Sequence, residues 1–157
     1  MNLLGLQLPQ HPLPSVNTDN VFMNKRVLIF GLPGAFTPTC SSKQLPKFEV
    51  MREQFYEKGI EEIYCVSVND AFVMNEWFKS QGIVGVKMLA DGNGILTERL
   101  GMLCKKDNLG FGARSWRYAA VINNGEVEKM FAEEGKCDNH TEDPYEISTP
   151  ENVYENI

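Results

Sequence analysis

Continuous runs of apolar residues alternate with polar segments along the chain and predict short buried strands. The clearest runs are Val27–Phe30 and Ile63–Val68, and a third, VKMLAD, covers residues 86–91. Short apolar runs bounded by turn-forming residues are typical of strands that are covered on both faces of a sheet. The pattern therefore predicts a sheet with several interior strands.

A different period begins after residue 40, where apolar residues recur every three or four positions. They are Leu45, Phe48, Met51 and Phe55. This spacing places them on one face of a helix, which we expect over residues 40–58. Thr39 is placed to cap the start of this helix and Gly59 to end it, while Pro46 is expected to bend it or to delay its start.

The remaining segments predict two more helices, a hairpin and a terminal helix. AFVMNEWFKSQG (71–82), with Phe72, Trp77 and Phe78 among its apolar residues, and GILTERLG (94–101) are the two helices. Two strand-like runs then flank Asn124-Gly125, a dipeptide that favours a tight hairpin turn. Thr149 and Pro150 suit the cap and the first position of a last helix.

The order of these elements indicates the fold class. Three strand–helix units precede the hairpin and the last helix, so a parallel part of the sheet is joined to an antiparallel part. We expect an α/β fold with a central mixed β-sheet flanked by helices, a C-terminal β-hairpin and a terminal helix. Residues 1–157 are predicted to form a single domain, with 1–16 as an extended N-terminal segment.

Charge and hydropathy exclude several classes of partner. Fifteen basic and twenty-one acidic residues give a net charge of -6, and the basic ones are scattered, so neither nucleic acid nor a membrane is expected as a partner. The first residues, MNLLGLQLPQHPLP, contain three prolines and no Lys or Arg, unlike a secretory signal. No apolar stretch is long enough to cross a bilayer. A cytoplasmic protein is predicted.

The four cysteines point to a reactive thiol rather than to a scaffold. They stand at positions 40, 65, 104 and 137. No two form a CxxC pair, which makes a zinc site unexpected, and a disulfide framework is disfavoured in a reducing compartment. Cys40 alone stands at a junction, between an apolar run and a predicted helix.

Cys40 has the surroundings of a nucleophile. In the first turn of a helix a thiol meets free backbone N–H groups and the positive end of the helix dipole, which favour the thiolate. Thr37 stands where a CxxC protein has its other cysteine, and its hydroxyl is placed to orient a polar substrate atom. Pro33 and Pro38 stiffen the turn. The alternative is an ordinary turn in which Cys40 is a small core residue.

Pro33, Thr37 and Cys40 have the spacing of the peroxiredoxin signature, and the string FGLPGAFTPTCS most resembles the type-5 branch of that family. Further similarity lies in YCVSVNDAFVMNEW and in DNLGFGARSWRYA, and it covers most of the chain from Asn17 onward. The resemblance implies a thioredoxin-like fold and thiol-dependent reduction of hydrogen peroxide and alkyl hydroperoxides. It also implies a homodimer and no metal or other cofactor.

The resemblance also assigns roles to residues. Cys40 would attack the peroxide, while Thr37 and the backbone N–H groups near Gly34 and Cys40 would bind its two oxygens. The family's arginine falls on Arg117, which would stabilise the thiolate and the leaving oxygen. Residues three apart on a strand face opposite sides, so Arg114 is expected to be exposed to solvent.

Apolar residues beside the arginine segment are candidates for substrate contact. Phe111, with Leu109 and Trp116, would form either an apolar rim of the site or ordinary packing. A rim would make organic hydroperoxides substrates alongside hydrogen peroxide.

The sulfenic acid formed on Cys40 must then be reduced. Some type-5 members use a second cysteine before the last helix, but this chain has Ile147 at about that position. Cys137 lies in an exposed polar loop and is a minor candidate for the resolving residue, whereas Cys65 is expected in the core and Cys104 has no evident partner. We expect a one-cysteine cycle in which glutathione with glutaredoxin, or thioredoxin, is the reductant.

Three alternatives remain at this point. A thioredoxin-like thiol–disulfide exchanger or binding protein without peroxidase activity would use CxxC, but TPTC supplies one sulfur. A cysteine hydrolase needs a histidine base, and His11 and His140 are the only histidines. A redox-sensitive interaction protein or chaperone is compatible with peroxidase activity.

Overall fold

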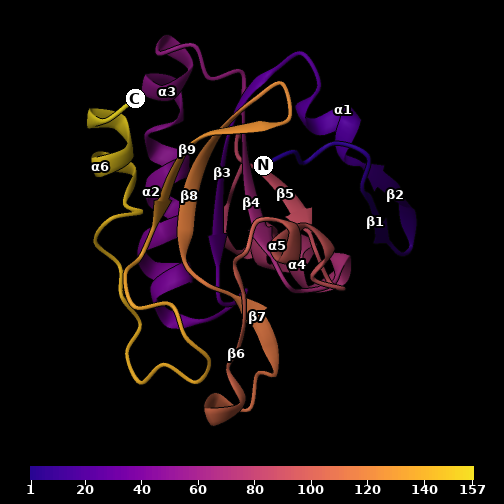
Figure 1. Ribbon diagram of the computed structural model, residues 1–157, viewed down its shortest axis with the longest axis vertical. Coiled ribbons are helices and arrows are strands. Elements are labelled where there is room, and N and C mark those ends of the chain that lie inside the picture. Colours follow the sequence, from indigo (N-terminus) through magenta and orange to yellow (C-terminus); the bar gives the residue numbers. More distant parts are fainter.

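A five-stranded sheet forms the centre of the computed structural model, which describes residues 1–157 (Figure 1). Its strands lie in the order β5 (Lys87–Ala90), β4 (Glu62–Ser67), β3 (Arg26–Leu32), β8 (Tyr118–Asn123) and β9 (Glu126–Ala132). β3, β4 and β5 are parallel, whereas β8 and β9 run antiparallel to their neighbours. The predicted α/β class and the mixed sheet are confirmed.

The central strand β3 explains why its sequence is apolar throughout. Leu28 and Phe30 belong to the core on one face of the sheet, and Val27 and Ile29 to the core on the other. All four side chains have no exposed surface. Because successive residues of a strand point to opposite faces, a strand that is covered on both sides needs no polar alternation.

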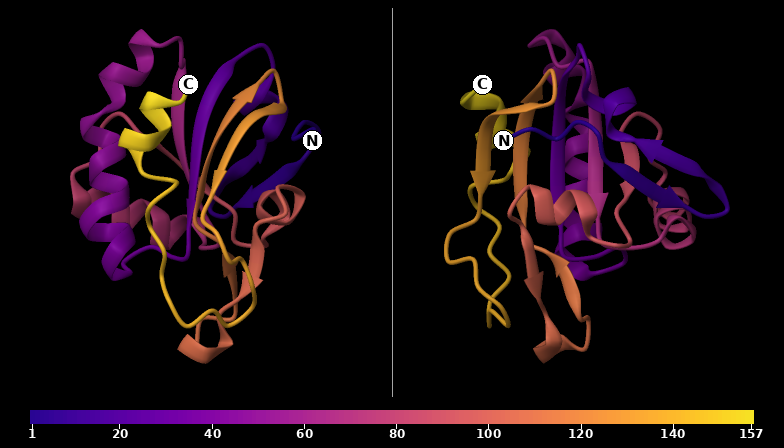
Figure 2. Two further views of the ribbon diagram at one scale, coloured as in Figure 1. Left: turned by 60° about the vertical axis from the view of Figure 1, so that its left-hand side comes forward. Right: turned by 45° about the vertical axis from the view of Figure 1, so that its right-hand side comes forward.

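Helices and a hairpin cover the two faces (Figure 2). One face packs against α2 (Leu45–Val50), α3 (Arg52–Glu57), α4 (Ala71–Gln81) and α6 (Pro150–Glu155). The other face packs against α1 (Thr18–Phe22), α5 (Ile95–Arg99) and residues near the N-terminus. No helix is both long and apolar enough to cross a membrane.

The N-terminal residues are more structured than the sequence indicated. The expected extended segment 1–16 contains a paired hairpin of β1 (Gln7–Gln10) and β2 (Leu13–Asn17). Leu3 and Leu8 are buried in the core, and the Gln10 side chain donates a hydrogen bond to the Ala90 carbonyl at 2.5 Å. These long-range contacts hold the N-terminal segment against the rest of the fold, and nothing in its local sequence predicts them.

The helix expected over residues 40–58 is divided into three parts. A π-helical turn, η1 (Cys40–Gln44), precedes α2, and Met51 separates α2 from α3. Pro46 has no N–H to continue an ordinary helical ladder, and beside it the Leu45 N–H bonds to the Cys40 carbonyl, five residues back. Gly59, with φ +88°, follows α3 and ends the helical region as predicted.

Capping by Thr39 was a wrong prediction. Thr39 already has helical backbone angles, and its side chain makes no capping hydrogen bond. The other terminal signals are confirmed, because Asn124 and Gly125 connect β8 to β9, and Thr149 accepts a hydrogen bond from the Asn152 N–H at 3.2 Å.

Two segments extend beyond the sheet and approach each other. β6 (Leu103–Lys105) and β7 (Ala113–Ser115) form a small hairpin whose tip is η2 (Asp107–Leu109). The segment 133–148, which we call the C-terminal loop, runs beside this hairpin (Figures 1 and 2). The Asn139 N–H donates to the Lys105 carbonyl at 2.8 Å.

Candidate active site

Cys40 lies where the chain leaves β3 and enters its first long helical region. Residues 33–39, the active-site turn, connect the two, and helical geometry begins at Pro38. Cys40 is thus in the first helical turn, as predicted. Its side chain is fully buried in this conformation.

Hydrogen bonds hold the active-site turn in shape. The Thr37 hydroxyl donates to the Gly34 carbonyl at 2.7 Å, and the Ala35 N–H donates to Asn69 Oδ1 at 3.0 Å. Phe36 has a φ of +63° and a side chain that is 53% exposed. Non-glycine residues rarely adopt this conformation, and such strain concentrates at functional sites. The turn therefore presents Phe36 to the solvent at a cost in backbone energy.

Arg117 is the residue that touches the Cys40 sulfur. It follows β7, is 2% exposed, and its Nη2 lies 3.4 Å from Cys40 Sγ. Its Nε donates to Gln44 Oε1 at 2.9 Å, and its Nη1 donates to Asp143 Oδ1 at 2.5 Å. Burial alone would lower the pKa of the Arg117 guanidinium, but the charges of Cys40 and Asp143 outweigh it and raise that pKa. Arg117 is thus a fixed cation against the sulfur.

Arg114 is not the solvent-exposed residue that strand alternation predicted. Its Nη1 donates to the Pro33 carbonyl at 3.1 Å, and its Nε donates to the Phe111 carbonyl at 3.3 Å. Burial lowers its pKa, and the charge of Cys40 partly offsets this. The alternation rule fails because β7 ends at Ser115 and the chain leaves strand geometry before β8. Arg114 clamps the active-site turn.

Two further side chains share the electrostatic environment of Cys40. Burial raises the pKa of the Cys65 thiol, and the charge of Cys40 raises it further. Tyr145 places its ring 5.6 Å from the Arg117 guanidinium, and its buried hydroxyl has no hydrogen-bond partner. Cys65 lies in the core, as expected, and both groups stay protonated at neutral pH.

A cleft of about 320 Å³ opens beside the active-site turn. Its walls are residues from the turn, from the segment after β6 and from the C-terminal loop: Pro33, Thr37, Pro38, Lys106, Leu109, Phe111, His140, Thr141, Glu142 and Asp143. Leu109 and Phe111 thus take the rim position that the sequence suggested. Trp116 does not, because it is 1% exposed and its indole N–H donates to the Glu133 carbonyl.

Cys137 is exposed, as predicted, and lies on the C-terminal loop beside β6. The next residue, Asp138, accepts a hydrogen bond from the Lys105 N–H at 2.8 Å. Burial raises the pKa of the neighbouring Cys104 thiol, and Cys137 and Asp138 contribute to that rise. Cys137 is therefore a neighbour of Cys104, a relation that the sequence did not indicate.

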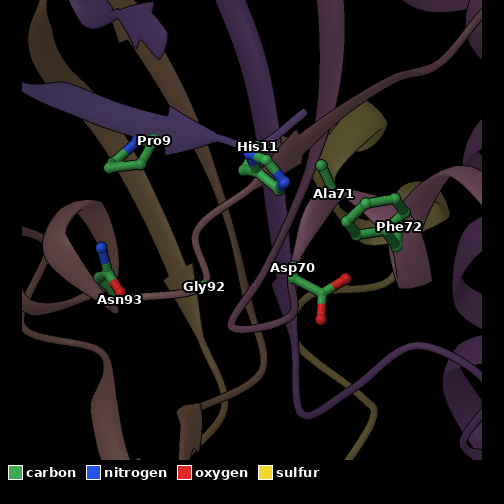
Figure 3. Close-up of a pocket in the computed structure, with 7 residues that line it drawn as sticks. All are labelled: Pro9, His11, Asp70, Ala71, Phe72, Gly92 and Asn93. Atoms are coloured by element: carbon green, nitrogen blue, oxygen red, sulfur yellow. The ribbon is translucent and has the colours of Figure 1, made fainter. Parts of the chain in front are cut away.

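Neither histidine is placed as a base for Cys40. His11 lines a separate cavity of about 290 Å³ between the N-terminal hairpin and the start of α4, together with Asp70 and Phe72 (Figure 3). His140 lines the cleft, but its Nδ1 accepts from the Glu142 N–H at 3.0 Å. The Cys40 sulfur instead accepts a hydrogen bond from Arg117 Nη2. A cysteine hydrolase is not supported by this arrangement.

Comparison with known proteins identifies the family. The Redoxin family profile matches residues 5–146. A peroxiredoxin of Rhizobium etli is 61% identical over 136 residues, which are 87% of this chain and 76% of that protein. The chain belongs to the peroxiredoxin family. The predicted thioredoxin-like fold is confirmed, and the chain is a thiol-dependent peroxidase.

Solved structures of peroxiredoxins agree with this one over nearly the whole chain. The antioxidant protein (1-Cys peroxiredoxin) of Plasmodium falciparum has a TM-score of 0.87 and 43% identity, covering 90% of this chain and 80% of its own. Reduced Prx3 from Vibrio vulnificus in complex with hydrogen peroxide has a TM-score of 0.88 and 36% identity, covering 99% and 96%.

Sequence reasoning missed three side chains of this peroxiredoxin's active site. Gln44 stands four residues after Cys40, and residues four apart lie on the same face of a helix. Its place beside Cys40 could therefore have been predicted from the sequence. Asp143 and Lys106 gave no local signal, because each is an ordinary charged residue in a loop. Only the packing of the C-terminal loop and of the β6–β7 hairpin brings them to the cleft.

Proposed function

We propose that this peroxiredoxin is a type-5 enzyme that reduces hydrogen peroxide and organic hydroperoxides through a one-cysteine cycle. The observation that carries the proposal is the 3.4 Å contact between Arg117 Nη2 and Cys40 Sγ in the first turn of a helix. A buried guanidinium at this distance stabilises a thiolate and the charge that leaves it. The FGLPGAFTPTCS string supports the type-5 assignment.

The chemical step needs no cofactor electrons. The Cys40 thiolate attacks one peroxide oxygen, the O–O bond breaks, and the sulfur is oxidised to sulfenic acid while the other oxygen leaves as hydroxide or alkoxide. That leaving oxygen takes a proton to become water or an alcohol. Arg117 is placed to stabilise the developing negative charge, because its guanidinium is already fixed before reaction.

The active-site turn would bind the peroxide oxygens. Thr37 Oγ1 donates to the Gly34 carbonyl, which leaves its oxygen free to accept a hydrogen bond from the peroxide. Backbone N–H groups near Gly34 and Cys40 would supply donors. Pro33 and Phe111 line the cleft from which substrate arrives.

An external thiol would reduce the sulfenic acid. Cys65 is buried and has a raised pKa, so its thiol is a poor nucleophile. Cys137 lies beside Cys104 and forms no contact with Cys40. We therefore assign reduction to glutathione with glutaredoxin, or to thioredoxin, in a reducing compartment such as the cytoplasm.

A homodimer is proposed on exposed apolar side chains of the active-site turn, of α4 and of the N-terminal hairpin. Phe36 is 53% exposed and Phe72, at the start of α4, is 59% exposed. Leu13 of the N-terminal hairpin is 57% exposed and shares a cavity with Phe72. Apolar side chains in such a position mark an interaction surface, and a second copy would bury them.

Sedimentation of the wild type and of Phe72→Glu tests this proposed dimer: the wild type should be a dimer and the variant a monomer.

Rapid mixing with peroxide tests the catalytic proposal. Reduced protein is mixed with hydrogen peroxide or an alkyl hydroperoxide, and oxidised Cys40 is then identified by intact mass and peptide analysis. We expect sulfenic acid on Cys40 and a mixed disulfide after glutathione is added. A Cys40–Cys65 or Cys40–Cys137 disulfide as the main product would contradict the one-cysteine cycle, and thiol exchange without peroxide consumption would contradict the peroxidase.

A further inference from the structure

Lys106 is a buried cation that the peroxidase mechanism does not use. The residue is 4% exposed, yet its ammonium forms neither a salt bridge nor a hydrogen bond with the protein. Its contact is with the face of Trp116, 5.6 Å from Nζ to the ring centroid. The fully buried side-chain atoms without a hydrogen-bond partner are the hydroxyl oxygens of Thr97, Tyr118 and Tyr145. Lys106 Nζ is not among them, so it retains access to solvent.

The backbone around Lys106 holds it in place. Its N–H donates to the Gly112 carbonyl at 2.8 Å, and its carbonyl accepts from the Leu109 and Phe111 N–H groups at 3.1 Å. These bonds close the loop 106–112 at its neck. Lys106 lines both the cleft and the small void beside Arg117. An ammonium that has an aromatic face beside it and no acidic partner favours an anionic ligand group in the cleft.

The cleft also carries one unpaired negative charge. Glu142 lines it, and its carboxylate forms no ion pair, whereas Asp143 is already bound to Arg117. A ligand with a carboxylate alone would meet Lys106 favourably and Glu142 unfavourably. A ligand that carries both a carboxylate and an ammonium group satisfies both residues.

We propose that Lys106 and Glu142 select a zwitterionic, amino-acid-like thiol as the reductant that enters this cleft. The inference rests on the proposed one-cysteine cycle and names the chemical class of its reductant. The carboxylate of the thiol binds Lys106, and its ammonium group faces Glu142. Thr37 and Pro33 lie on the same cleft, so the thiol sulfur of a ligand held there approaches oxidised Cys40 from the side of the active-site turn.

The reaction is balanced by two thiols. The first thiol attacks the sulfur of the Cys40 sulfenic acid, forming a mixed disulfide and releasing water. A second thiolate attacks the ligand sulfur of that disulfide, which returns Cys40 to its reduced state and yields the symmetrical disulfide of the ligand. The electrons that reduce the peroxide thus come from the pair of thiols.

The test compares thiols that differ only in charge. Protein oxidised with one equivalent of hydrogen peroxide is mixed with cysteine, 3-mercaptopropionate, cysteamine or 2-mercaptoethanol, and the rate of loss of the sulfenic acid is measured. Lys106→Met keeps an apolar side chain against Trp116. It should slow reduction by cysteine and by 3-mercaptopropionate about tenfold, the size of one charge-assisted hydrogen bond. Reduction by cysteamine and 2-mercaptoethanol should change by less than about twofold.

Glu142→Gln gives an independent test, because removing this negative charge should affect cationic and anionic thiols in opposite directions. It should slow reduction by cysteamine about threefold and accelerate reduction by 3-mercaptopropionate by a similar factor, since Glu142 is exposed and its charge is partly screened. Lys105→Met, which removes a neighbouring exposed lysine, is the matched control and should leave all four rates as in the wild type.

Several outcomes would overturn the proposal. Equal slowing of all four thiols by Lys106→Met would mean that Lys106 has a structural role. Slowing confined to oxidation by a carboxylate-bearing alkyl hydroperoxide, relative to tert-butyl hydroperoxide, would assign the carboxylate to the peroxide instead. A wild type whose Cys40 is not oxidised by hydrogen peroxide would contradict the proposed function itself, whereas normal oxidation followed by charge-insensitive reduction would contradict only this inference.

Discussion

The two sides of Arg117 differ in how they are built. On one side, Cys40 and Gln44 belong to one short helical turn that continues directly from the active-site turn. On the other side, Asp143 and Pro144 belong to the C-terminal loop, which is fixed by separate contacts rather than by regular structure. Glu133, at the start of this loop, accepts hydrogen bonds through its carboxylate from three backbone N–H groups at the end of the loop. They belong to Glu146, Ile147 and Ser148.

This difference assigns the two sides different tasks. The helical side positions the sulfur and would bind the peroxide, and its geometry depends on local backbone structure. The loop side covers Arg117 and supplies a counter-charge, since Asp143 is half exposed and paired with a buried cation. Chemistry should therefore be sensitive to changes on the helical side, and stability or access to changes on the loop side.

Removal of the shared residue should have the largest effect. Arg117→Ala should slow the oxidation of Cys40 by hydrogen peroxide by roughly 10³-fold, because it removes the charge that stabilises the leaving oxygen. Arg114→Ala should slow it by less than about tenfold, since Arg114 holds the Pro33 carbonyl and does not touch the sulfur. Stopped-flow fluorescence measures both rates, and equal losses would contradict this assignment of roles.

The next largest effect is expected on the helical side. Thr37→Val removes the hydroxyl from the active-site turn while keeping its shape, and it should slow peroxide attack by roughly 10²-fold. Thr37→Ser retains the hydroxyl and should recover most of the rate. Loss of the same size in both variants would show that packing of the Thr37 methyl group matters more than its oxygen.

On the loop side, Glu133→Gln should reduce stability. The pKa of Glu133 is lowered because hydrogen bonds from Ser148 and its neighbours outweigh the effect of burial. A carboxyl with a lower pKa in the folded state stabilises the protein above its unfolded pKa of about 4.3 and loses that contribution as the pH falls. The variant should lose about 2 kcal/mol of unfolding free energy at pH 7.

Urea denaturation at several pH values checks this expectation. The difference from the wild type should shrink below about pH 4, where the wild-type carboxyl becomes protonated. Glu134→Gln, an exposed neighbour, is the matched control. A constant difference across the pH range would mean that the substitution acts through packing.

The smallest effect should come from Asp143→Asn. Asp143 is half exposed, so solvent screens its charge, and in the variant Arg117 keeps its hydrogen bonds to Gln44 and to the Pro144 carbonyl. Peroxide oxidation of Cys40 should change by no more than about fivefold, while amide hydrogen exchange in residues 134–147 should increase. Loss of activity as large as in Arg117→Ala would place Asp143 within the catalytic machinery and erase the contrast between the two sides.

The sequence alone identified the elements whose contacts are local. The Cys40 junction, the three strand–helix units and the Asn124-Gly125 hairpin all depend on neighbours within a few residues, and apolar period and turn chemistry report them directly. The resemblance of the segment SWRYA to the peroxiredoxin family then supplied Arg117, and the structure places it against the sulfur.

What tertiary structure decided depends on contacts between distant segments. Arg117 meets Cys40 across 77 residues and Asp143 across 26, and the N-terminal Gln10 meets Ala90 across 80. No local pattern encodes which charged loop residue will pair with a buried guanidinium, or that Lys106 will be largely buried against Trp116 without an acidic partner. Local structural propensity depends on the order of neighbouring residues. Charge pairing and burial depend on which distant segments come together when the chain folds.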